Sequence, residues 1–194
     1  MKQTVRTFVA VELNPEVRRR AEELIEQLAA AGADVKWVET HNLHLTVKFL
    51  GDVRLQETPA VCKAVEAAAA KVEPFELEIR GAGAFPTARR PRTVWLGAGD
   101  GQEPMAVLHK HLETALGKLG FRKEQRRFHP HLTIGRVRRG GPAVAELGKL
   151  LEQNADFDAG RISVAGVVVF SSQLGREGPT YEALGRAKLG GGGR

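Results

Sequence analysis

The chain of 194 residues contains a single cysteine, Cys62. An intramolecular disulfide and a zinc site built from cysteines are therefore both excluded. A chain without structural disulfides fits a reducing compartment, so we expect a cytoplasmic location.

Long hydrophobic runs are also missing. No segment approaches the length of a transmembrane helix. The apolar stretch from Phe8 to Val11 is short, lies between Arg6 and Glu12, and is followed by no small-residue cleavage site. We therefore expect no membrane partner and no secretory signal.

Hydrophobic residues make up 42% of the chain and charged residues 27%, as in ordinary soluble globular proteins. The length suits one well-buried core or one bilobed unit, and is too short for two ordinary independent domains. We predict a single bilobed domain over residues 1–189, followed by a flexible glycine-rich tail at residues 190–194.

Positive charge exceeds negative charge by six and is concentrated in three clusters. These clusters contain Arg89, Arg90 and Arg92; Arg122, Lys123, Arg126 and Arg127; and Arg136, Arg138 and Arg139. Such clusters suit a polyanion such as RNA, although basic runs are often only solvated surface.

One four-residue motif occurs once in each half of the chain. His44-Leu45-Thr46-Val47 and His131-Leu132-Thr133-Ile134 share the pattern His-Leu-Thr-aliphatic within apolar segments of strand character. Side chains alternate between the faces of a strand, so the histidine and the threonine of each copy share one face while the apolar residues point into the core.

This repeat predicts acid–base chemistry on a phosphate. Histidine titrates near neutrality, and a threonine hydroxyl can donate a hydrogen bond to a phosphate oxygen. Two facing copies would place an acid, a base and two hydroxyl donors around one phosphorus atom. From the residues alone, either histidine can be the acid.

Strands and helices alternate along the chain without the regular β-α-β order of a doubly wound sheet. We expect strands at residues 4–13, 35–38, 43–50, 75–80, 93–96, 131–137, 162–170 and 180–184. We expect helices at 15–31, 58–72, 103–119 and 143–151, the first capped by Asn14 with Pro15 in its first turn, and a loop rich in glycine, proline and arginine at 81–92. The pattern predicts an α+β fold of two pseudo-twofold-related lobes, each with an antiparallel sheet and helices, around a central cleft.

Four segments, covering nearly the whole chain, resemble a known family. They are residues 6–10 (RTFVA), 42–51 (NLHLTVKFLG), 128–136 (FHPHLTIGR) and 171–181, with its SSQL and GPTY stretches. On these segments the chain resembles the RNA 2',3'-cyclic phosphodiesterases, also described as 2'-5' RNA ligases, of the two-histidine phosphoesterase superfamily.

The resemblance implies hydrolysis of RNA 2',3'-cyclic phosphate ends to 2'-phosphomonoesters, without a metal or another cofactor. It implies His131 as the proton acceptor, His44 as the proton donor, and Thr46 and Thr133 as the phosphate-binding residues. The partners would be RNA ends, with tRNA fragments and small cyclic nucleotides as further candidates. The resemblance also allows reversible 2'-5' RNA ligation, which is the reverse of 2'-5' bond cleavage, as a further activity. Because one chain contains both motifs, we expect a monomer.

The resemblance also implies that Phe49 and Arg136 hold a nucleobase between ring and guanidinium. Each lies five positions after its histidine, and strict alternation would aim both side chains away from the catalytic face unless the strand ends, bulges or twists. The same rule would place Lys48 on the face of His44, where it either contacts phosphate or is solvated.

Two other interpretations stay open. His41, His44, His129 and His131 could be four zinc ligands, although the threonines would then have no role and no carboxylate or cysteine lies nearby. Alternatively, the chain is a non-catalytic RNA-binding module, which would not need two matched titratable groups. Two further histidines, His109 and His111, lie within a predicted helix, and we expect them at the surface.

Overall fold

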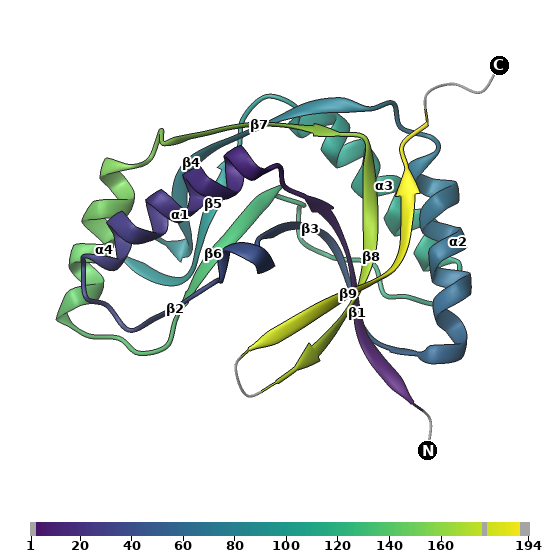
Figure 1. Ribbon diagram of the computed structural model, residues 1–194, viewed down its shortest axis with the longest axis horizontal. Helices are drawn as coiled ribbons and strands as arrows, with labels where there is room; N and C mark the ends of the chain where they lie inside the picture. The colour runs from purple at the N-terminus through teal and green to yellow at the C-terminus, as the bar shows by residue number, and fades with distance from the viewer. Residues whose placement is uncertain (1–2, 176–177, 191–194) are drawn as a thin grey trace.

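In the described part of the chain, two antiparallel sheets and four α-helices form a fold of the expected α+β class. The computed structural model of the chain describes residues 3–175 and 178–190. Sheet A has the strand order β3-β1-β8-β9, and sheet B has the order β2-β6-β5-β4-β7 (Figure 1). The strands of sheet A are β1 (Thr4–Glu12), β3 (His44–Arg54), β8 (Gly166–Leu174) and β9 (Pro179–Lys188). Those of sheet B are β2 (Val35–Trp37), β4 (Phe75–Thr87), β5 (Arg90–Ala98), β6 (His131–Val137) and β7 (Asp158–Val164).

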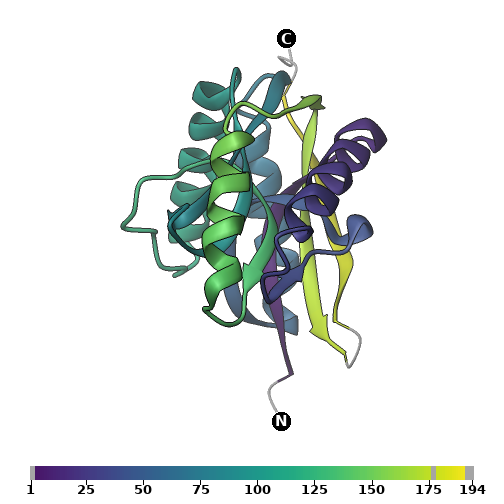
Figure 2. The same ribbon diagram turned by 90° about the vertical axis from the view of Figure 1, so that its left-hand side faces the viewer.

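The helices lie in two pairs. They are α1 (Pro15–Ala29), α2 (Thr58–Ala69), α3 (Gln102–Gly117) and α4 (Pro142–Gln153). Helices α1 and α4 pack on sheet B, whereas α2 packs on sheet A and against α3 (Figures 1 and 2). Helices α2 and α4 therefore lie at opposite ends of the molecule (Figure 1).

The lobes are not simply the two halves of the sequence. Sheet A combines the early strands β1 and β3 with the late strands β8 and β9, and sheet B takes β2 from the first half. The chain thus crosses between the sheets several times, which ties the two lobes into one unit with a shared hydrophobic core.

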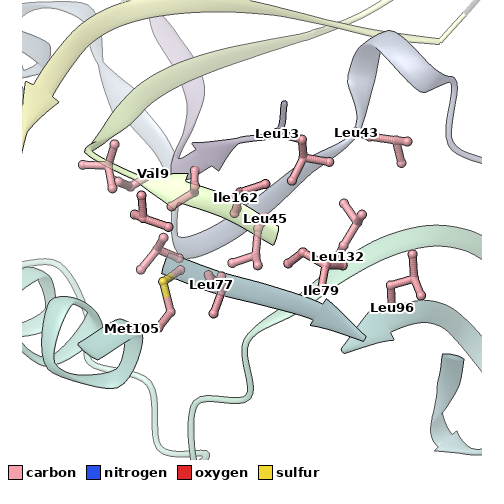
Figure 3. Close-up of a cluster of buried hydrophobic side chains, with 14 of the residues drawn as sticks. Val9, Leu13, Leu43, Leu45, Leu77, Ile79, Leu96, Met105, Leu132 and Ile162 are labelled. Carbon is pink, nitrogen blue, oxygen red and sulfur yellow. The ribbon is translucent and has the colours of Figure 1, made fainter. Parts of the chain in front are cut away.

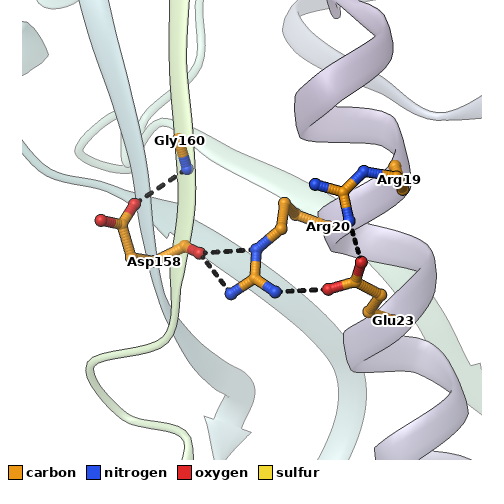
Figure 4. A network of polar contacts seen from close by, with 5 residues as sticks. All are labelled: Arg19, Arg20, Glu23, Asp158 and Gly160. Atoms are coloured by element: carbon orange, nitrogen blue, oxygen red, sulfur yellow. Dashed lines mark hydrogen bonds and ion pairs between the residues drawn. The ribbon is translucent and has the colours of Figure 1, made fainter.

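Helix α1 begins where the sequence predicts a helix start. The side chain of Asn14 accepts a hydrogen bond from the Val17 amide at 2.8 Å, and Pro15 occupies the first turn. Further along, the Arg20 guanidinium donates to the Asp158 carbonyl at 3.0 and 3.2 Å and pairs with Glu23 (Figure 4). This network holds α1 against the start of β7.

The core contains the apolar residues of both motif strands. Leu45 and Leu132 are fully buried in the same cluster, together with Leu77, Ile79 and Leu96 (Figure 3). The alternation of apolar and polar residues therefore turns the other face of β3 and of β6 away from the core.

The predicted loop at residues 81–92 is wrong. Strand β4 continues to Thr87, and β5 begins at Arg90, so the two form one long hairpin. The glycines that suggested a loop are required by packing: a Cβ atom at Gly83 would lie 2.2 Å from the Trp95 ring. A glycine within a strand often marks such a close approach.

The single strand predicted at residues 162–170 is wrong as well. It consists of the end of β7 and the start of β8, which belong to different sheets and are separated by Ala165. The other predicted elements are present with shifted ends, and β6 has the predicted bounds, His131–Val137. Residues 191–194 of the predicted tail lie outside the described residues. Among the helices of the described residues, none is long and apolar enough to span a membrane.

Candidate active site

His44 and His131 occupy equivalent places in the two sheets: each is the first residue of its strand, β3 or β6. These two strands pack against each other at the junction of the sheets. Each histidine and its threonine, Thr46 or Thr133, is half-buried, while the apolar residues between them are buried. The structure thus places both motifs on the faces that the alternation predicts.

The two imidazoles are anchored in the same way. Nδ1 of His44 lies 2.7 Å from the Asn42 carbonyl oxygen, and Nδ1 of His131 lies 2.7 Å from the His129 carbonyl oxygen. A carbonyl can only accept, so Nδ1 carries the hydrogen in both rings. Nε2 of each ring is therefore the atom left for a substrate. This is the arrangement that a pair of proton-transfer groups requires.

An aromatic ring meets each imidazole edge to face. The Tyr181 ring lies 5.1 Å from the His44 ring at 88°, and the Phe85 ring lies 5.1 Å from the His131 ring at 90°. Phe8 also stacks on His44, with ring centroids 4.7 Å apart. Together with the Nδ1 hydrogen bonds, these contacts restrict the rotation of both imidazoles.

Burial is the main reason that both histidines are weak bases here. It lowers the pKa of His44, the hydrogen bond to Asn42 opposes this effect, and the charge of Arg18 lowers the pKa further. Burial likewise lowers the pKa of His131, against the His129 carbonyl bond, and the Arg136 charge adds to the effect. Both imidazoles are consequently neutral at pH 7 in the free protein, because their pKa lies below the ordinary value of about 6.5.

A β-bulge in each motif strand determines the position of the fifth residue after the histidine. Ala10 pairs with Thr46 while Val9 pairs with Lys48, so β3 contains one extra residue at this point. Trp95 pairs with Thr133 and Val94 with Gly135, which is the equivalent irregularity in β6. An extra residue reverses the alternation beyond it.

The two bulges bring Phe49 and Arg136 to the faces of their histidines. Phe49 is 49% exposed, and its ring lies 5.5 Å from that of Phe8, which stacks on His44. Arg136 is exposed and donates to Thr93 Oγ1 at 3.3 Å. Both strands therefore contain the bulge that strict alternation requires before Phe49 and Arg136 can share a face with their histidines.

The prediction that Lys48 shares the face of His44 is wrong for the same reason. Lys48 is 1% exposed, its ammonium pairs with Glu113, and it donates to the Arg122 carbonyl at 3.1 Å. It cannot be solvated, and it lies on the core side of the strand beneath the site.

Arg136 connects the two motifs electrostatically. Its positive charge contributes to the lowered pKa of His131, after burial. Burial raises the pKa of Tyr181, and the charges of Arg136 and Arg6 oppose that rise. Tyr181 contacts the His44 ring, so the charge of Arg136 acts on His131 and on an aromatic neighbour of His44.

Comparison with known proteins agrees with this geometry. Residues 13–173 match the family model described as the 2'-5' RNA ligase superfamily, and this range includes both motifs. The chain belongs to the 2'-5' RNA ligase superfamily.

Two curated relatives are similar to this chain over almost their full length. An RNA 2',3'-cyclic phosphodiesterase of Methanothermobacter thermautotrophicus is 39% identical over 178 residues, which cover 91% of this chain and 95% of the relative. One from Aeropyrum pernix is 35% identical over 175 residues, which cover 90% and 98%.

Solved structures show the same fold. The protein TT0787 of Thermus thermophilus superposes with a TM-score of 0.80 at 27% identity and covers 96% of this chain and 100% of its own. E. coli LigT complexed with 3'-AMP superposes with a TM-score of 0.75 at 26% identity, covering 96% and 99%.

The four histidines of the zinc alternative do not form a ligand set. Among the residues that the structure describes, no three His, Cys, Asp or Glu side chains are grouped so as to hold a metal ion. The His41 side chain is 71% exposed and lies 3.3 Å from Glu39. His129 is also exposed, and its carbonyl holds His131.

The expected surface position of His109 is wrong. His109 is buried, with 9% exposure, and its ring stacks on that of Phe128, with centroids 4.2 Å apart. Its Nε2 lies 3.7 Å from Glu113, the carboxylate that pairs with Lys48. The spacing of the histidines within one helix carried no sign of this contact with a distant loop.

Sequence reasoning assigned no role to three residues around His44, namely Phe8, Asn42 and Tyr181. Asn42 is 9% exposed, donates through its amide to the Pro179 carbonyl at 3.0 Å, and accepts from His44 through its own carbonyl. All three residues belong to segments that carried the family resemblance. Their position in that resemblance was the only signal in the sequence.

Proposed function

We propose that this chain hydrolyses the 2',3'-cyclic phosphate at the end of an RNA to a 2'-phosphomonoester. Membership of the 2'-5' RNA ligase superfamily and the curated relatives named RNA 2',3'-cyclic phosphodiesterase support the reaction class. The observation that carries the proposal is the matched anchoring of two imidazoles through Nδ1, which leaves Nε2 of both for proton transfer.

The two histidines take opposite roles in one displacement. Nε2 of His131 accepts a proton from water as the water oxygen bonds to phosphorus. The bond between phosphorus and the ribose 3' oxygen breaks on the opposite side, and Nε2 of His44 delivers its proton to that oxygen. The 2' oxygen keeps the phosphate, which gives the 2'-monoester.

Thr46 and Thr133 bind the non-bridging phosphate oxygens. Both lie two residues after their histidine on the same half-buried face. Within the described residues neither hydroxyl has a hydrogen-bond partner. Donors already in place stabilise the charge that grows on these oxygens in the transition state, with each one contributing about 3 kcal/mol.

Phe49 and Arg136 hold the base of the terminal nucleotide. The half-exposed Phe49 ring offers a stacking face, and Arg136 offers a planar cation on the other motif strand. The two bulges make this assignment compatible with the alternation of the strands.

Substrate binding leads His44 to take up from solvent the proton that it later donates. Burial lowers the pKa of His44 in the free protein, whereas a bound phosphodiester anion raises the pKa of an adjacent imidazole. The acid is thus protonated most strongly in the complex, where its proton is used.

The chain works as a cytoplasmic monomer in this proposal. Both motifs belong to one chain, and strands of both halves build each sheet, so no second copy is needed to complete the site. The first substrates to try are RNA ends with a 2',3'-cyclic phosphate, such as those of tRNA fragments, and small cyclic nucleotides.

The test is hydrolysis of an oligoribonucleotide ending in a 2',3'-cyclic phosphate, in the presence of EDTA, with the product phosphate located by 31P NMR. Wild type should form the 2'-phosphate. His44→Ala and His131→Ala should each lose at least about 100-fold in kcat, a conservative figure for loss of a proton-transfer group.

His41→Ala is the matched control, because this histidine is exposed and precedes the first motif by three positions. It should retain wild-type turnover. Activity that requires added zinc would favour the metal alternative. RNA binding without turnover in wild type would favour the binding module.

A further inference from the structure

Two of the three arginine clusters meet at one pocket. It has a volume of about 530 Å³ and lies where the β4–β5 turn, the end of β6 and the start of α4 come together. Its lining includes Arg89, Arg90, Arg92, Arg138 and Arg139. No acidic residue is among the described residues that line it. We call it the arginine pocket.

Most of this positive charge is not neutralised. In the described part of the chain, the side chains of Arg89, Arg90, Arg92 and Arg138 make no ion pair and no hydrogen bond. Arg139 has only a contact of 3.8 Å with Asp34. Guanidinium groups gathered without counter-charges repel one another, and an anionic ligand would offset that repulsion.

The backbone of the pocket also suits an anion. Helix α4 begins beside Gly140 and Gly141 with no capping side chain and no acidic residue in its first turn. A Cβ atom at either glycine would meet nothing within 4 Å, so this entrance is open. Pro142 has no N–H and the Val144 amide donates to the Gly141 carbonyl at 3.1 Å, so the helix start contributes mainly the positive end of its dipole to the attraction of the guanidinium groups.

The pocket lies on the continuation of the catalytic strand. Arg138 follows His131 by seven residues, which is at most about 23 Å along an extended chain. Arg136, the proposed base-binding residue, lies between them. A stacked single strand rises about 3.4 Å per nucleotide, so about seven nucleotides span this distance.

We propose that the arginine pocket binds backbone phosphates of the substrate RNA upstream of its cyclic end. The inference rests on the proposed function and makes it narrower: the preferred substrate is an oligonucleotide, and a cyclic mononucleotide is too short to reach both places. RNA is favoured over an acidic protein as the ligand. An RNA whose terminal phosphate is bound at the catalytic histidines has further phosphates at regular intervals, and these can extend to the pocket. Guanidinium groups bind such phosphates through two parallel hydrogen bonds.

The test compares a ten-nucleotide RNA with a nucleoside 2',3'-cyclic phosphate, using wild type and Arg90→Gln/Arg138→Gln. The matched control is Lys63→Gln/Lys71→Gln, which removes the same charge from two exposed lysines, one in α2 and one just after it, at the far end of the molecule (Figure 1). All four positions are exposed, and thermal unfolding should show equal stability.

For the ten-nucleotide RNA, the arginine variant should lose several-fold in kcat/KM at 50 mM salt, while the mononucleotide rate and the control variant stay at the wild-type level. A single strand contributes about 0.7 to the salt slope per phosphate contact. Two lost contacts reduce the slope by about 1.4, so wild type should fall about sevenfold more than the variant between 50 and 200 mM salt.

Equal losses on both substrates, or equal losses in the lysine control, would overturn the proposal. If wild type hydrolyses neither substrate, the proposed function fails, and the pocket is then tested by the anisotropy of a labelled ten-nucleotide RNA with a plain 3' hydroxyl. This RNA should bind wild type and the lysine control more tightly than the arginine variant. If a poly-glutamate peptide displaced the labelled RNA as strongly as unlabelled RNA does, the proposal that the pocket binds RNA in preference to an acidic protein would also be contradicted.

Discussion

Replacement of Lys48 by methionine separates a structural role from a phosphate contact. In the structure its ammonium is buried, pairs with Glu113, and donates to the Arg122 carbonyl. Methionine fills a similar volume but leaves the Glu113 carboxylate in the core without its cation. Removal of one partner of a buried pair costs about 3–5 kcal/mol. Glu113 still accepts from the Glu124 amide at 3.0 Å, so we expect the lower end, about 3 kcal/mol.

For a chain of this size, each kcal/mol corresponds to about 2–4 °C in Tm, so Lys48→Met should lower Tm by about 6–12 °C. The RNA concentration that gives half-maximal rate should not change at temperatures where the variant is folded. The double variant Lys48→Met/Glu113→Leu should regain most of the stability, because no unpaired charge remains. Lys63→Met at the surface is the control and should change stability by less than about 0.5 kcal/mol. An unchanged Tm together with a tenfold higher KM for RNA would refute this reasoning and restore Lys48 as a phosphate contact.

Four other predictions concern the site residues. Phe49→Ala should raise KM for RNA about tenfold in steady-state kinetics, since base stacking contributes about 1–3 kcal/mol, while Phe49→Tyr should retain the wild-type value; equal KM values in both variants would contradict the stacking role. Thr46→Val or Thr133→Val should lower kcat about 100-fold with little change in stability, because each removes a donor to the transition state but keeps the side-chain shape; a loss confined to KM would contradict this. The pH profile of kcat/KM should have both limbs displaced to acid, since burial lowers the pKa of His44 and His131 in the free protein. The alkaline limb of kcat should lie at higher pH than that of kcat/KM, since bound phosphate raises the pKa of the acid, His44. Because the pKa of His44 and of His131 is lower in the folded state, the unfolded chain binds more protons below about pH 6.5. The contribution of these histidines to the free energy of unfolding should therefore fall on acidification and be level above that pH. A free energy of unfolding that rises toward pH 5 would contradict the lowered pKa values.

The part of the site that local alternation determines could be predicted from the sequence. In β6, the alternation after His131 gives the bounds of the strand, the buried face and the shared face of histidine and threonine. The repeated motif points to two equivalent positions in the fold. These features depend on neighbours one or two positions away along the chain, so the sequence contains all the information they need.

The bulges could not be predicted in the same way. One extra residue at Val47 or Ile134 changes the face of everything beyond it, yet it leaves the apolar pattern of each motif unchanged. Burial of Lys48 likewise depends on Glu113, a residue 65 positions later in α3. The spacing of residues along the sequence does not reveal a pair this far apart.

Contacts between distant strands account for the other differences. Tyr181 reaches His44 because β9 joins sheet A beside β8, and sheet A also contains β1 and β3. The hairpin of β4 and β5 extends through a segment rich in glycine and proline because the Trp95 ring covers Gly83. Both features follow from sheet topology, which local sequence patterns do not determine.

The roles of the two histidines are tested most directly with an RNA end in which sulfur replaces the bridging 3' oxygen of the cyclic phosphate. A thiolate leaves without a proton, so His44→Ala should hydrolyse this substrate at nearly the wild-type rate, although it fails on the oxygen substrate. His131→Ala should fail on both, because attacking water still needs a base. Rescue of His131→Ala instead of His44→Ala would contradict the assignment of acid and base, and rescue of neither would contradict a proton transfer from His44 to the leaving oxygen.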